Sequence, residues 1–349
     1  MTKVILSLDI GGTKINGALV DAKTLRIVYR AKKISSKPHQ KQLLPAIAAT
    51  VDALRAQAQQ HRWNLIGCGA VVAGQVWWPS GVVRWSPNIN MRKRVFPLRR
   101  WLANRCHAPT MVDNDVHGFL LGECALGSTR TYPLVVAITL GTGIGGAIAL
   151  DGQLIRGVEN KAGEFGHTTI FPPNGLPKRC ADGLPGHFEQ YGSGQAIRQW
   201  YRLLSKQTPL LSSSGLPPPL ARVGVPRGSS NDKRRGSRIK SAMTNGGFHD
   251  PRSVSLTTFE IEQRWYDHDP IAIAAVANVR SAIAQGLANI MIGLNPDAII
   301  LGGGLIRMKP LIHGLNAEVG TFLPFPVKTK ILLSKLGDDA QLIGAATLV

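Results

Sequence analysis

The stretch Asp9-Ile10-Gly11-Gly12-Thr13-Lys14 stands between two apolar runs near the start of the chain. Residues 4–8 are typical of a buried strand, and residues 15–21 have the alternation of a second strand. Two strands joined through adjacent glycines form a tight hairpin. Because glycine has no Cβ, the N–H groups of this turn can face a ligand, and with the Thr13 hydroxyl and the Lys14 charge they suit a phosphate. An ordinary turn, in which Asp9 caps its own backbone, is the alternative.

A second glycine-rich stretch repeats this design farther along the chain. Residues 133–140 are apolar, the turn Gly141-Thr142-Gly143-Ile144-Gly145-Gly146 follows, and residues 147–150 are apolar again. A third run, 152–155, completes the meander as residues 26–31 complete the first one. The repeat indicates an internal duplication, with two similar domains facing each other across a cleft. Opposed glycine hairpins could grip one polyphosphate, so the pair is stronger evidence than either turn alone.

Length and composition indicate a globular protein with two domains. The chain has 349 residues, of which 44% are hydrophobic, enough to fill two cores. We find no apolar run long enough to cross a bilayer and no room for a signal peptide before the first strand, so we expect a cytoplasmic protein without membrane contact. The four cysteines lack the spacing of a disulfide framework, and we expect reduced thiols.

The charge balance favours anionic partners. Lysine and arginine number 41 against 21 acidic residues, a net charge of +20. No zinc-finger, helix-turn-helix or aromatic RNA-binding signature accompanies them, so nucleic acid is disfavoured, and phosphorylated small molecules or no specific partner are equal candidates. Residues 205–255 are rich in serine, proline and basic residues and lack a periodic apolar pattern. We predict that this basic segment is disordered or forms a long mobile loop.

Carboxylates lie where a short predicted strand, 109–113, meets a predicted helix, 118–126. Asp113 and Asp115 flank Asn114 at this junction. One of the two carboxylates could cap the helix, because a helix N-terminus stabilises anions. A carboxylate that faces a cleft could instead act as a general base toward a hydroxyl group.

The loop that follows the second meander carries four residues that are competent zinc ligands. They are His167, Cys180, Asp182 and His187. A metal ion could staple a loop that has little core of its own. The alternative is that these residues lie in solvent, since the closely spaced cysteine pairs of typical zinc sites are missing.

Taken together, these stretches resemble the ROK family of bacterial sugar kinases and sugar-responsive repressors. The resemblance covers nearly the whole chain except about 205–255. Its motifs are Asp9-Ile-Gly-Gly-Thr-Lys14, Asn114-Asp115, Leu140-Gly-Thr-Gly-Ile-Gly-Gly146, Gly163-Glu-Phe-Gly-His167, and Asn295-Pro-Asp through Leu301-Gly-Gly-Gly304. It implies an α/β fold of two duplicated actin-like, ribonuclease H-like domains around a central cleft. The expected domains are 1–117 and 118–337, with the helix 338–349 packing back on the first.

The resemblance also implies an activity, ATP-dependent phosphorylation of a hexose or N-acetylhexosamine hydroxyl, usually at C6. In that scheme Asp115 matches the general base, Asp9 lies near Mg²⁺, and the two glycine hairpins hold the nucleotide phosphates. Gly302 and Gly303 match the glycines on the adenosine side. The sugar hydroxyls would be bound by Asp115 together with Asn88, Asn114, Glu164, His167 and Glu189.

Departures from the family pattern leave alternatives open. Asp182 and His187 stand where most relatives have cysteine ligands of a Cys3His zinc site, so zinc binding is an open question here. A degenerate sugar-binding protein without turnover is one alternative. A repressor is disfavoured, because only eight residues precede the first motif. A homodimer is expected from the family alone, and Glu164 disfavours N-acetylmannosamine as the substrate.

Overall fold

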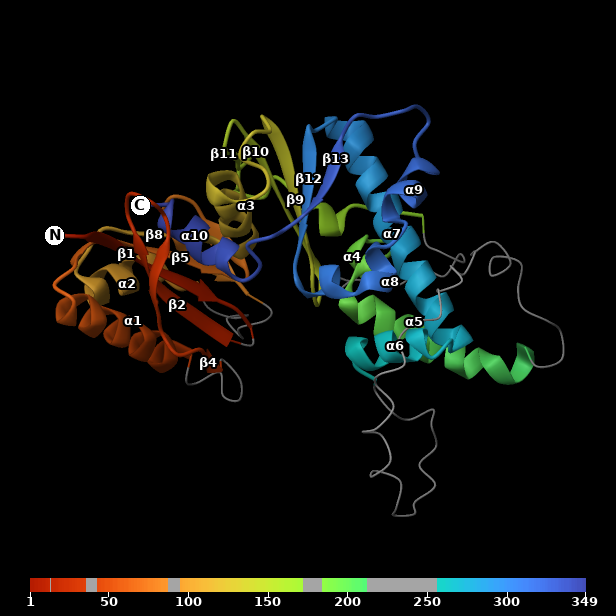
Figure 1. Ribbon diagram of the computed structural model, residues 1–349, viewed down its shortest axis with the longest axis horizontal. Coiled ribbons are helices and arrows are strands. Elements are labelled where there is room, and N and C mark those ends of the chain that lie inside the picture. The colour runs from red at the N-terminus through yellow and green to blue at the C-terminus, as the bar shows by residue number, and fades with distance from the viewer. Residues whose placement is uncertain (13, 36–42, 87–94, 172–183, 212–255) are drawn as a thin grey trace, which may run out of the picture.

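The computed structural model describes residues 1–12, 14–35, 43–86, 95–171, 184–211 and 256–349. The chain forms two α/β halves that lie side by side along the longest axis of the molecule, with a pair of helices between them (Figure 1). Within helix α5 the backbone alone is described for residues 207–211.

The first half is built on a six-stranded sheet with the order β3-β2-β1-β5-β8, and β4 pairs with β2. β1 and β2 are antiparallel, and β5 and β8 run parallel to β1. The apolar run predicted at 4–8 forms the buried centre of β1. The elements of this half are β1 (Lys3–Ile10), β2 (Lys14–Asp21), β3 (Ile27–Arg30), β4 (Ile34–Ser35), α1 (Leu43–Gln60), β5 (Asn64–Val72), β6 (Gln75–Trp77), β7 (Val82–Trp85), α2 (Leu98–Cys106) and β8 (Thr110–Asn114).

The second half repeats this topology in a five-stranded sheet with the order β11-β10-β9-β12-β13. β9 and β10 are antiparallel, whereas β12 and β13 run parallel to β9. An antiparallel meander followed by two parallel strands therefore occurs twice, as the repeated glycine motif predicts. The strands are β9 (Leu134–Leu140), β10 (Ile144–Leu150), β11 (Gln153–Ile155), β12 (Ala298–Gly302) and β13 (Lys330–Leu333).

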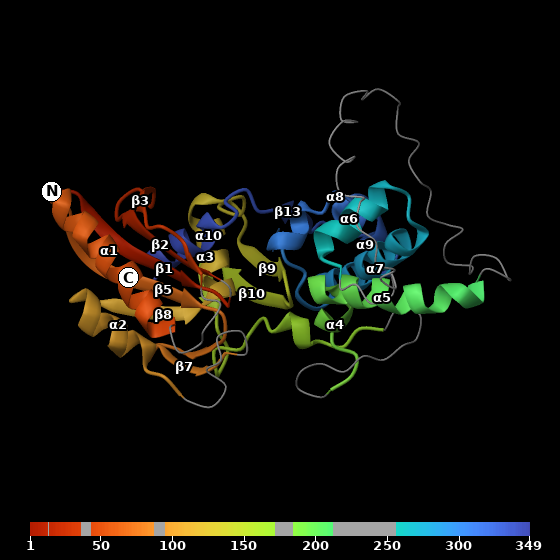
Figure 2. The same cartoon turned by 90° about the horizontal axis from the view of Figure 1, so that it is seen from below.

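Two helices lie between the sheets, α3 (Asp115–Leu126) and α10 (Asp339–Ala346) (Figure 2). α10 packs on the first sheet through Leu342 and Ala346, and α3 packs on the second through Phe119 and Leu120. The two helices cross so closely that a Cβ at Gly344 would lie 1.8 Å from the carbonyl oxygen of Gly118. The absence of side chains at this crossing lets the halves approach each other. The exact domain limits of 1–117 and 118–337 stay a prediction.

The remaining helices cover the second sheet and form the largest core with it. They are α4 (Glu189–Gly192), α5 (Gly194–Leu211), α6 (Thr258–Tyr266), α7 (Pro270–Leu294), α8 (Lys309–Ile312) and α9 (Leu315–Gly320). α7 begins at Pro270 after the N-cap Asp269, whose side chain accepts from the amides of Ile271 and Ala272, and it ends at Asn295 in a left-handed conformation.

Helix α7 also corrects one expectation. Among the residues that the structure describes, it is the one helix long and apolar enough to cross a membrane, with a mean hydropathy of 1.4 in its most apolar window. The statement that no apolar run reaches this length was wrong, because isoleucine and valine residues spaced among the alanines of this helix raise its mean hydropathy. The same window is 56% buried inside the protein, as is typical of a core helix.

A second correction concerns the start of the basic segment. The α5 helix continues to Leu211, so residues 205–211 are helical rather than disordered. The rest of the segment predicted to be disordered, 212–255, lies outside the described residues.

Candidate active site

A cleft of about 650 Å³ opens between the two halves. This volume is in the range of small-molecule binding sites. Both glycine-rich turns and the β8–α3 junction contribute to its wall. The cleft is lined by Gly11, Gly12, Ala73, Gly74, Gln75, Asn114, Asp115, Val116, Thr139, Gly141, Thr142, Gly143, Ile144, Gly145, Gly146, Glu164, His167, Glu189, Gly303 and Gln341.

The two glycine turns face this cleft from opposite halves. The Gly11 amide donates to the Lys14 carbonyl at 3.0 Å, and the Gly141 amide donates to the Gly143 carbonyl at 3.0 Å. These two N–H groups therefore close their own turns. A phosphate would have to use the neighbouring amides, such as those of Gly12 and Thr142.

The second turn lies directly against the start of α3. A Cβ at Gly145 would come within 2.5 Å of the Val116 side chain. Only glycine allows β10 to approach the helix turn this closely. Gly145 thus brings the second glycine turn next to Asp115.

The junction of β8 and α3 places Asp115 at the first position of the helix. The N-cap is Asn114, whose side-chain oxygen accepts from the amides of Val116 at 2.8 Å and His117 at 3.4 Å. Of the two alternatives for these carboxylates, helix capping by Asp113 or Asp115 does not occur, because Asn114 between them is the N-cap. Asp115 is left to face the cleft, and burial raises the pKa of its carboxyl, although the amide of Val116 lowers it.

Asp9 lies near the end of β1, just before the first glycine turn. Its carboxylate accepts from Nδ2 of Asn16 at 2.7 Å. Burial raises the pKa of Asp9 to about 6, the Asn16 hydrogen bond opposes that rise, and the negative charges of Asp115 and Asp338 add to it. The carboxylates of Asp9 and Asp115 are therefore close enough to influence each other.

Like Asp9, two further residues of the predicted nucleotide site, Lys14 and Gly302, are not among those that line the cleft. The Lys14 ammonium pairs with the Asp338 carboxylate at 2.5 Å, in the segment that enters α10. Gly302 is buried, and a Cβ there would meet the ring of Phe119 at 2.4 Å. Gly303, in contrast, lines the cleft with a φ of +86°.

Glu164, His167 and Glu189 of the predicted sugar ring line the same cleft as Asn114 and Asp115. The His167 ring also contacts His187, with the two Nδ1 atoms 3.3 Å apart and the rings at 88° to each other. His187 belongs to the predicted metal site, so His167 connects that site with the cleft.

The sequence of this chain is similar to those of known sugar kinases. Residues 5–349 match the model of the ROK family. The chain belongs to the ROK family. The glucokinase of Streptomyces coelicolor is 28% identical over 98% of this chain and 96% of its own length. The N-acetyl-D-glucosamine kinase of Erwinia tasmaniensis is 28% identical over 97% of each chain.

A solved structure also matches this ROK protein over its whole length. It is the ROK family glucokinase from Streptomyces griseus in complex with glucose and AMPPNP, with a TM-score of 0.73, 27% identity and 99% coverage of both chains. This similarity confirms the predicted fold class, in which two duplicated actin-like α/β halves enclose a cleft.

Four of the predicted site residues of this ROK chain lie outside the described residues. They are Thr13 of the first turn, Asn88 of the sugar ring, and Cys180 and Asp182 of the metal loop. Among the residues that the structure does describe, no group of three or more metal-ligating side chains is found.

Sequence reasoning missed several residues of the site. Gln341 lines the cleft and lies in no recognisable motif, whereas Gln75 lies at the carboxyl end of a predicted strand, where ligands of α/β proteins are expected. A neighbouring cavity of about 530 Å³ shares Gly141 and Thr142 with the cleft and is also lined by Arg198 and Arg307. Only the packing of α5 and α6 against the loop after β12 creates this cavity, so no local pattern could have indicated it.

Proposed function

We propose that this ROK protein is a sugar kinase that transfers the γ-phosphoryl group of ATP to a hydroxyl of a hexose or N-acetylhexosamine, the C6 hydroxyl in our proposal. The observation that carries the proposal is the position of Asp115, a carboxyl of raised pKa in a cleft bordered by two opposed glycine turns. The kinase names of the relatives support the same activity.

In the proposed reaction Asp115 is the general base. Its ionised carboxylate takes the proton of the sugar hydroxyl as that oxygen attacks the γ-phosphorus. The bond from the γ-phosphorus to the bridging oxygen breaks, and ADP leaves with the electron pair. A raised pKa suits this task, because it makes the carboxylate a stronger base than an ordinary surface aspartate.

The sugar would lie between Asn114 of the first half and the acidic side chains of the second half. Glu164 and Glu189 can each accept two hydroxyl hydrogen bonds. The Asn114 oxygen already caps α3 and its Nδ2 donates to the Gly74 carbonyl, so Asn114 can offer its second Nδ2 hydrogen to the sugar. We place His167 and Asn88 in the same ring, the latter from outside the described residues.

The nucleotide would extend from the glycine turns toward Gly303. We place its phosphates against the turns at Gly11–Gly12 and at Gly141, Thr142, Gly143 and Gly145. The cavity that adjoins Gly141 and Thr142 supplies room for the nucleoside on the Gly303 side. Lys14 would contribute by fixing Asp338 and the start of α10 rather than by contacting phosphate.

Mg²⁺ fits the oxygen ligands offered by Asp9, by its hydrogen-bond partner Asn16, and by Gln341, which lines the cleft. The Oδ1 of Asn16 and the Oε1 of Gln341 are both buried and have no hydrogen-bond partner among the described residues. Oxygen ligands of this kind, together with a carboxylate, suit a hard cation and its water shell. We propose that Asp9, Asn16 and Gln341 hold the hydrated ion, which when bound would neutralise phosphate charge.

Zinc fits the His167–His187 pair. Two nitrogen ligands at 2.0–2.1 Å from a tetrahedral ion lie about 3.4 Å apart, close to the Nδ1–Nδ1 distance of 3.3 Å. We propose that zinc is bound here with Cys180 and Asp182, which would brace the loop behind the sugar residues.

The proposal is tested by an ADP-release assay with Mg²⁺-ATP and a panel of hexoses and N-acetylhexosamines. At least one sugar should give ADP well above the rate without sugar, and Asp115→Asn should lower that signal by about 100-fold or more. If folded, metal-replete protein binds a sugar but leaves ADP at background with all of them, the degenerate sugar-binding alternative replaces the kinase. A homodimer stays a prediction, to be measured by sedimentation.

A further inference from the structure

The side chain of Arg156 joins the two halves of the protein behind the cleft. Arg156 follows β11 in the second half, and its guanidinium donates to the carboxylate of Asp113, in β8 of the first half, at 2.5 Å. Asp113 is fully buried, and the Arg156 side chain is only 20% exposed. This ion pair is therefore well shielded from water and is geometrically restrained.

The Asp113 carboxylate collects donors from both halves. Besides Arg156, it accepts from Nδ1 of His117 at 2.9 Å and from Nδ2 of Asn160 at 3.0 Å. It also accepts from the backbone amide of Asn114 at 2.8 Å. Burial alone would raise the pKa of Asp113, but the hydrogen bond and charge of His117 and the Arg156 guanidinium lower it, so the group is held as a carboxylate.

The Arg156 guanidinium is also held by the β6–β7 hairpin and by its own loop. It lies over the ring of Trp78, 3.7 Å from the ring centroid, and donates to Oδ1 of Asn160 at 3.0 Å. Asn160 in turn donates to the Val76 carbonyl at 3.1 Å. A flat guanidinium can stack and form directed hydrogen bonds at once, whereas a lysine ammonium cannot.

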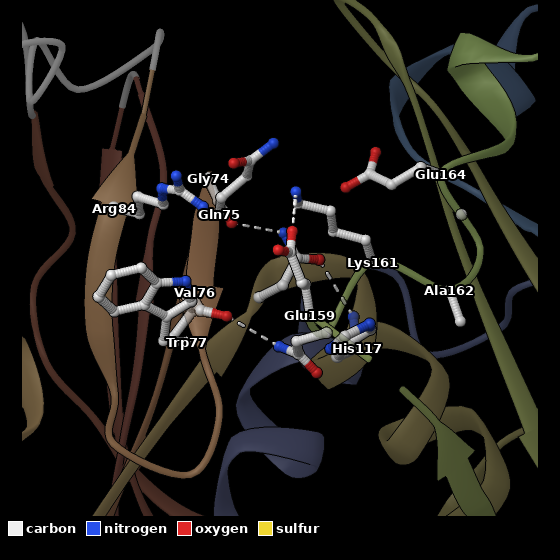
Figure 3. Close-up of a pocket in the computed structure, with 13 residues that line it drawn as sticks. Gly74, Gln75, Val76, Trp77, Arg84, His117, Glu159, Lys161, Ala162 and Glu164 are labelled. Atoms are coloured by element: carbon white, nitrogen blue, oxygen red, sulfur yellow. Dashed lines mark hydrogen bonds and ion pairs between the residues drawn. The ribbon is translucent and has the colours of Figure 1, made fainter. Parts of the chain in front are cut away.

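The segment fixed in this way leads directly to the predicted sugar residues. Figure 3 shows Lys161, Ala162 and Glu164 facing Gln75, Trp77 and Arg84 of the β6–β7 hairpin across a small cavity. This cavity has a volume of about 20 Å³, room for about one water molecule. On the other side of the ion pair, Asp113 precedes Asp115 by two residues in the chain.

We infer that Arg156 is a positioning residue, which sets the loop carrying Glu164 against the β8–α3 turn carrying Asp115. The inference rests on the proposed function and deepens it, because it names the contact that aligns the sugar with its base. Arg156 is not among the residues that line the cleft. Its contribution is to fix the loop that carries Glu164 relative to the β8–α3 turn that carries Asp115, through its ion pair with Asp113.

The decisive variant is Arg156→Lys, which keeps the charge and removes the forked, stacked geometry. We expect the KM for sugar to rise about tenfold or more, because small misplacements of a substrate cost large factors, while the KM for ATP stays within about twofold. The matched control is Arg280→Lys. Arg280 pairs with Glu318 at 2.5 Å with 19% exposure, but joins α7 to α9 away from the cleft. Both variants should lose similar thermal stability, and only the first should change the sugar KM.

A second variant, Asn160→Gly, removes side-chain hydrogen bonds without straining the backbone. Asn160 has a φ of +59°, which glycine adopts freely. It should raise the sugar KM in the same direction as Arg156→Lys. An unchanged sugar KM in Arg156→Lys, or equal effects on sugar and ATP in both variants, would overturn the inference.

The role of Arg156 can still be tested if the wild-type protein proves inactive. Background ADP release from the wild type overturns the proposed function, not the role of Arg156. Hydrogen exchange then decides the inference, since Arg156→Lys should speed exchange in both 110–117 and 157–164, and Arg280→Lys should do so in neither. Faster exchange in only one segment, or in none, contradicts a link between them.

Discussion

Asp113 and Asp115 lie two residues apart at the junction of β8 and α3, and the pKa values of their carboxyls are shifted in opposite directions. Asp113 is buried among cationic and amide donors, which lower its pKa despite the burial. Asp115 is desolvated beside the negative charge of Glu164, and its pKa is raised. Such divergence separates a structural carboxylate from one suited to proton transfer.

The first prediction concerns the pH dependence of the proposed reaction. Asp115 must be ionised to act as a base, so kcat/KM for sugar should fall as the pH drops through a pKa above 3.8. Because the Glu164 charge contributes to the raised pKa, Glu164→Gln should move this acidic limb to lower pH. The measurement is a pH–rate profile of both proteins, with Glu159→Gln as the control that leaves the limb in place.

The size of the proposed catalytic effect of Asp115 can be measured with the Asp115→Asn variant. Asp115→Asn should lower kcat by about 10²- to 10⁴-fold, the usual contribution of a positioned base, while sugar affinity measured by calorimetry stays within about threefold. A variant that loses sugar binding and turnover together would show that Asp115 serves binding, not proton transfer.

The parts of the site that follow from local pattern were predictable. Two glycines between apolar runs indicated each hairpin, and the repeated meander indicated the duplicated fold. The role of Asn114 was not predictable, because three adjacent polar residues offered three possible caps. The partners of Lys14 and Asp113 were also hidden, since Asp338 and Arg156 come from distant parts of the chain and carry no local signal.

The second prediction is that Asp9→Asn stabilises the protein at neutral pH while impairing turnover. The folded pKa of Asp9 is about 6 against an ordinary 3.8, so the fold favours the protonated form. The contribution of Asp9 to stability is fully present below pH 3.8 and is lost as the pH rises from 3.8 to about 6. Above that window the ionised form costs up to about 3 kcal/mol, which the asparagine variant avoids.

Chemical denaturation at several pH values measures this difference. The free energy of unfolding of Asp9→Asn minus that of the wild type should grow between pH 3.8 and 6 and then level off. Without Mg²⁺ the effect should be largest, since a bound cation would relieve the penalty. A difference that stays constant across this window would show that burial does not disfavour the Asp9 charge.

The third prediction compares two adjacent glycines at the end of β12. Gly303 has a φ of +86°, and a Cβ there would lie 2.4 Å from the carbonyl oxygen of Leu140, so Gly303→Ala should cost at least about 1–2 kcal/mol. A Cβ at Gly304 would meet no described atom within 4 Å, so Gly304→Ala should change stability little. Gly303→Ala should also raise the KM for ATP, because Gly303 lines the cleft.

Thermal unfolding and nucleotide titration of the two variants provide the measurement. Equal loss of stability in both would mean that strain at Gly303 is relieved by movement of the loop. An unchanged ATP affinity in a destabilised Gly303→Ala protein would place the nucleotide away from this turn.

The fourth prediction concerns the metal proposed at His167 and His187. Protein purified without chelator should contain about one zinc ion per chain, because the two Nδ1 atoms already stand at the spacing of ligands on one tetrahedral ion. Removing zinc should lower the melting temperature, and adding it back should restore it, since metal binding contributes to folding. His187→Ala should lose the metal and the response to it. His313→Ala, at an exposed position outside the loop, should keep both. Zinc-free protein whose melting temperature ignores added zinc would leave the histidine pair as a direct ring contact, and the loop would then have to be held by its packing alone.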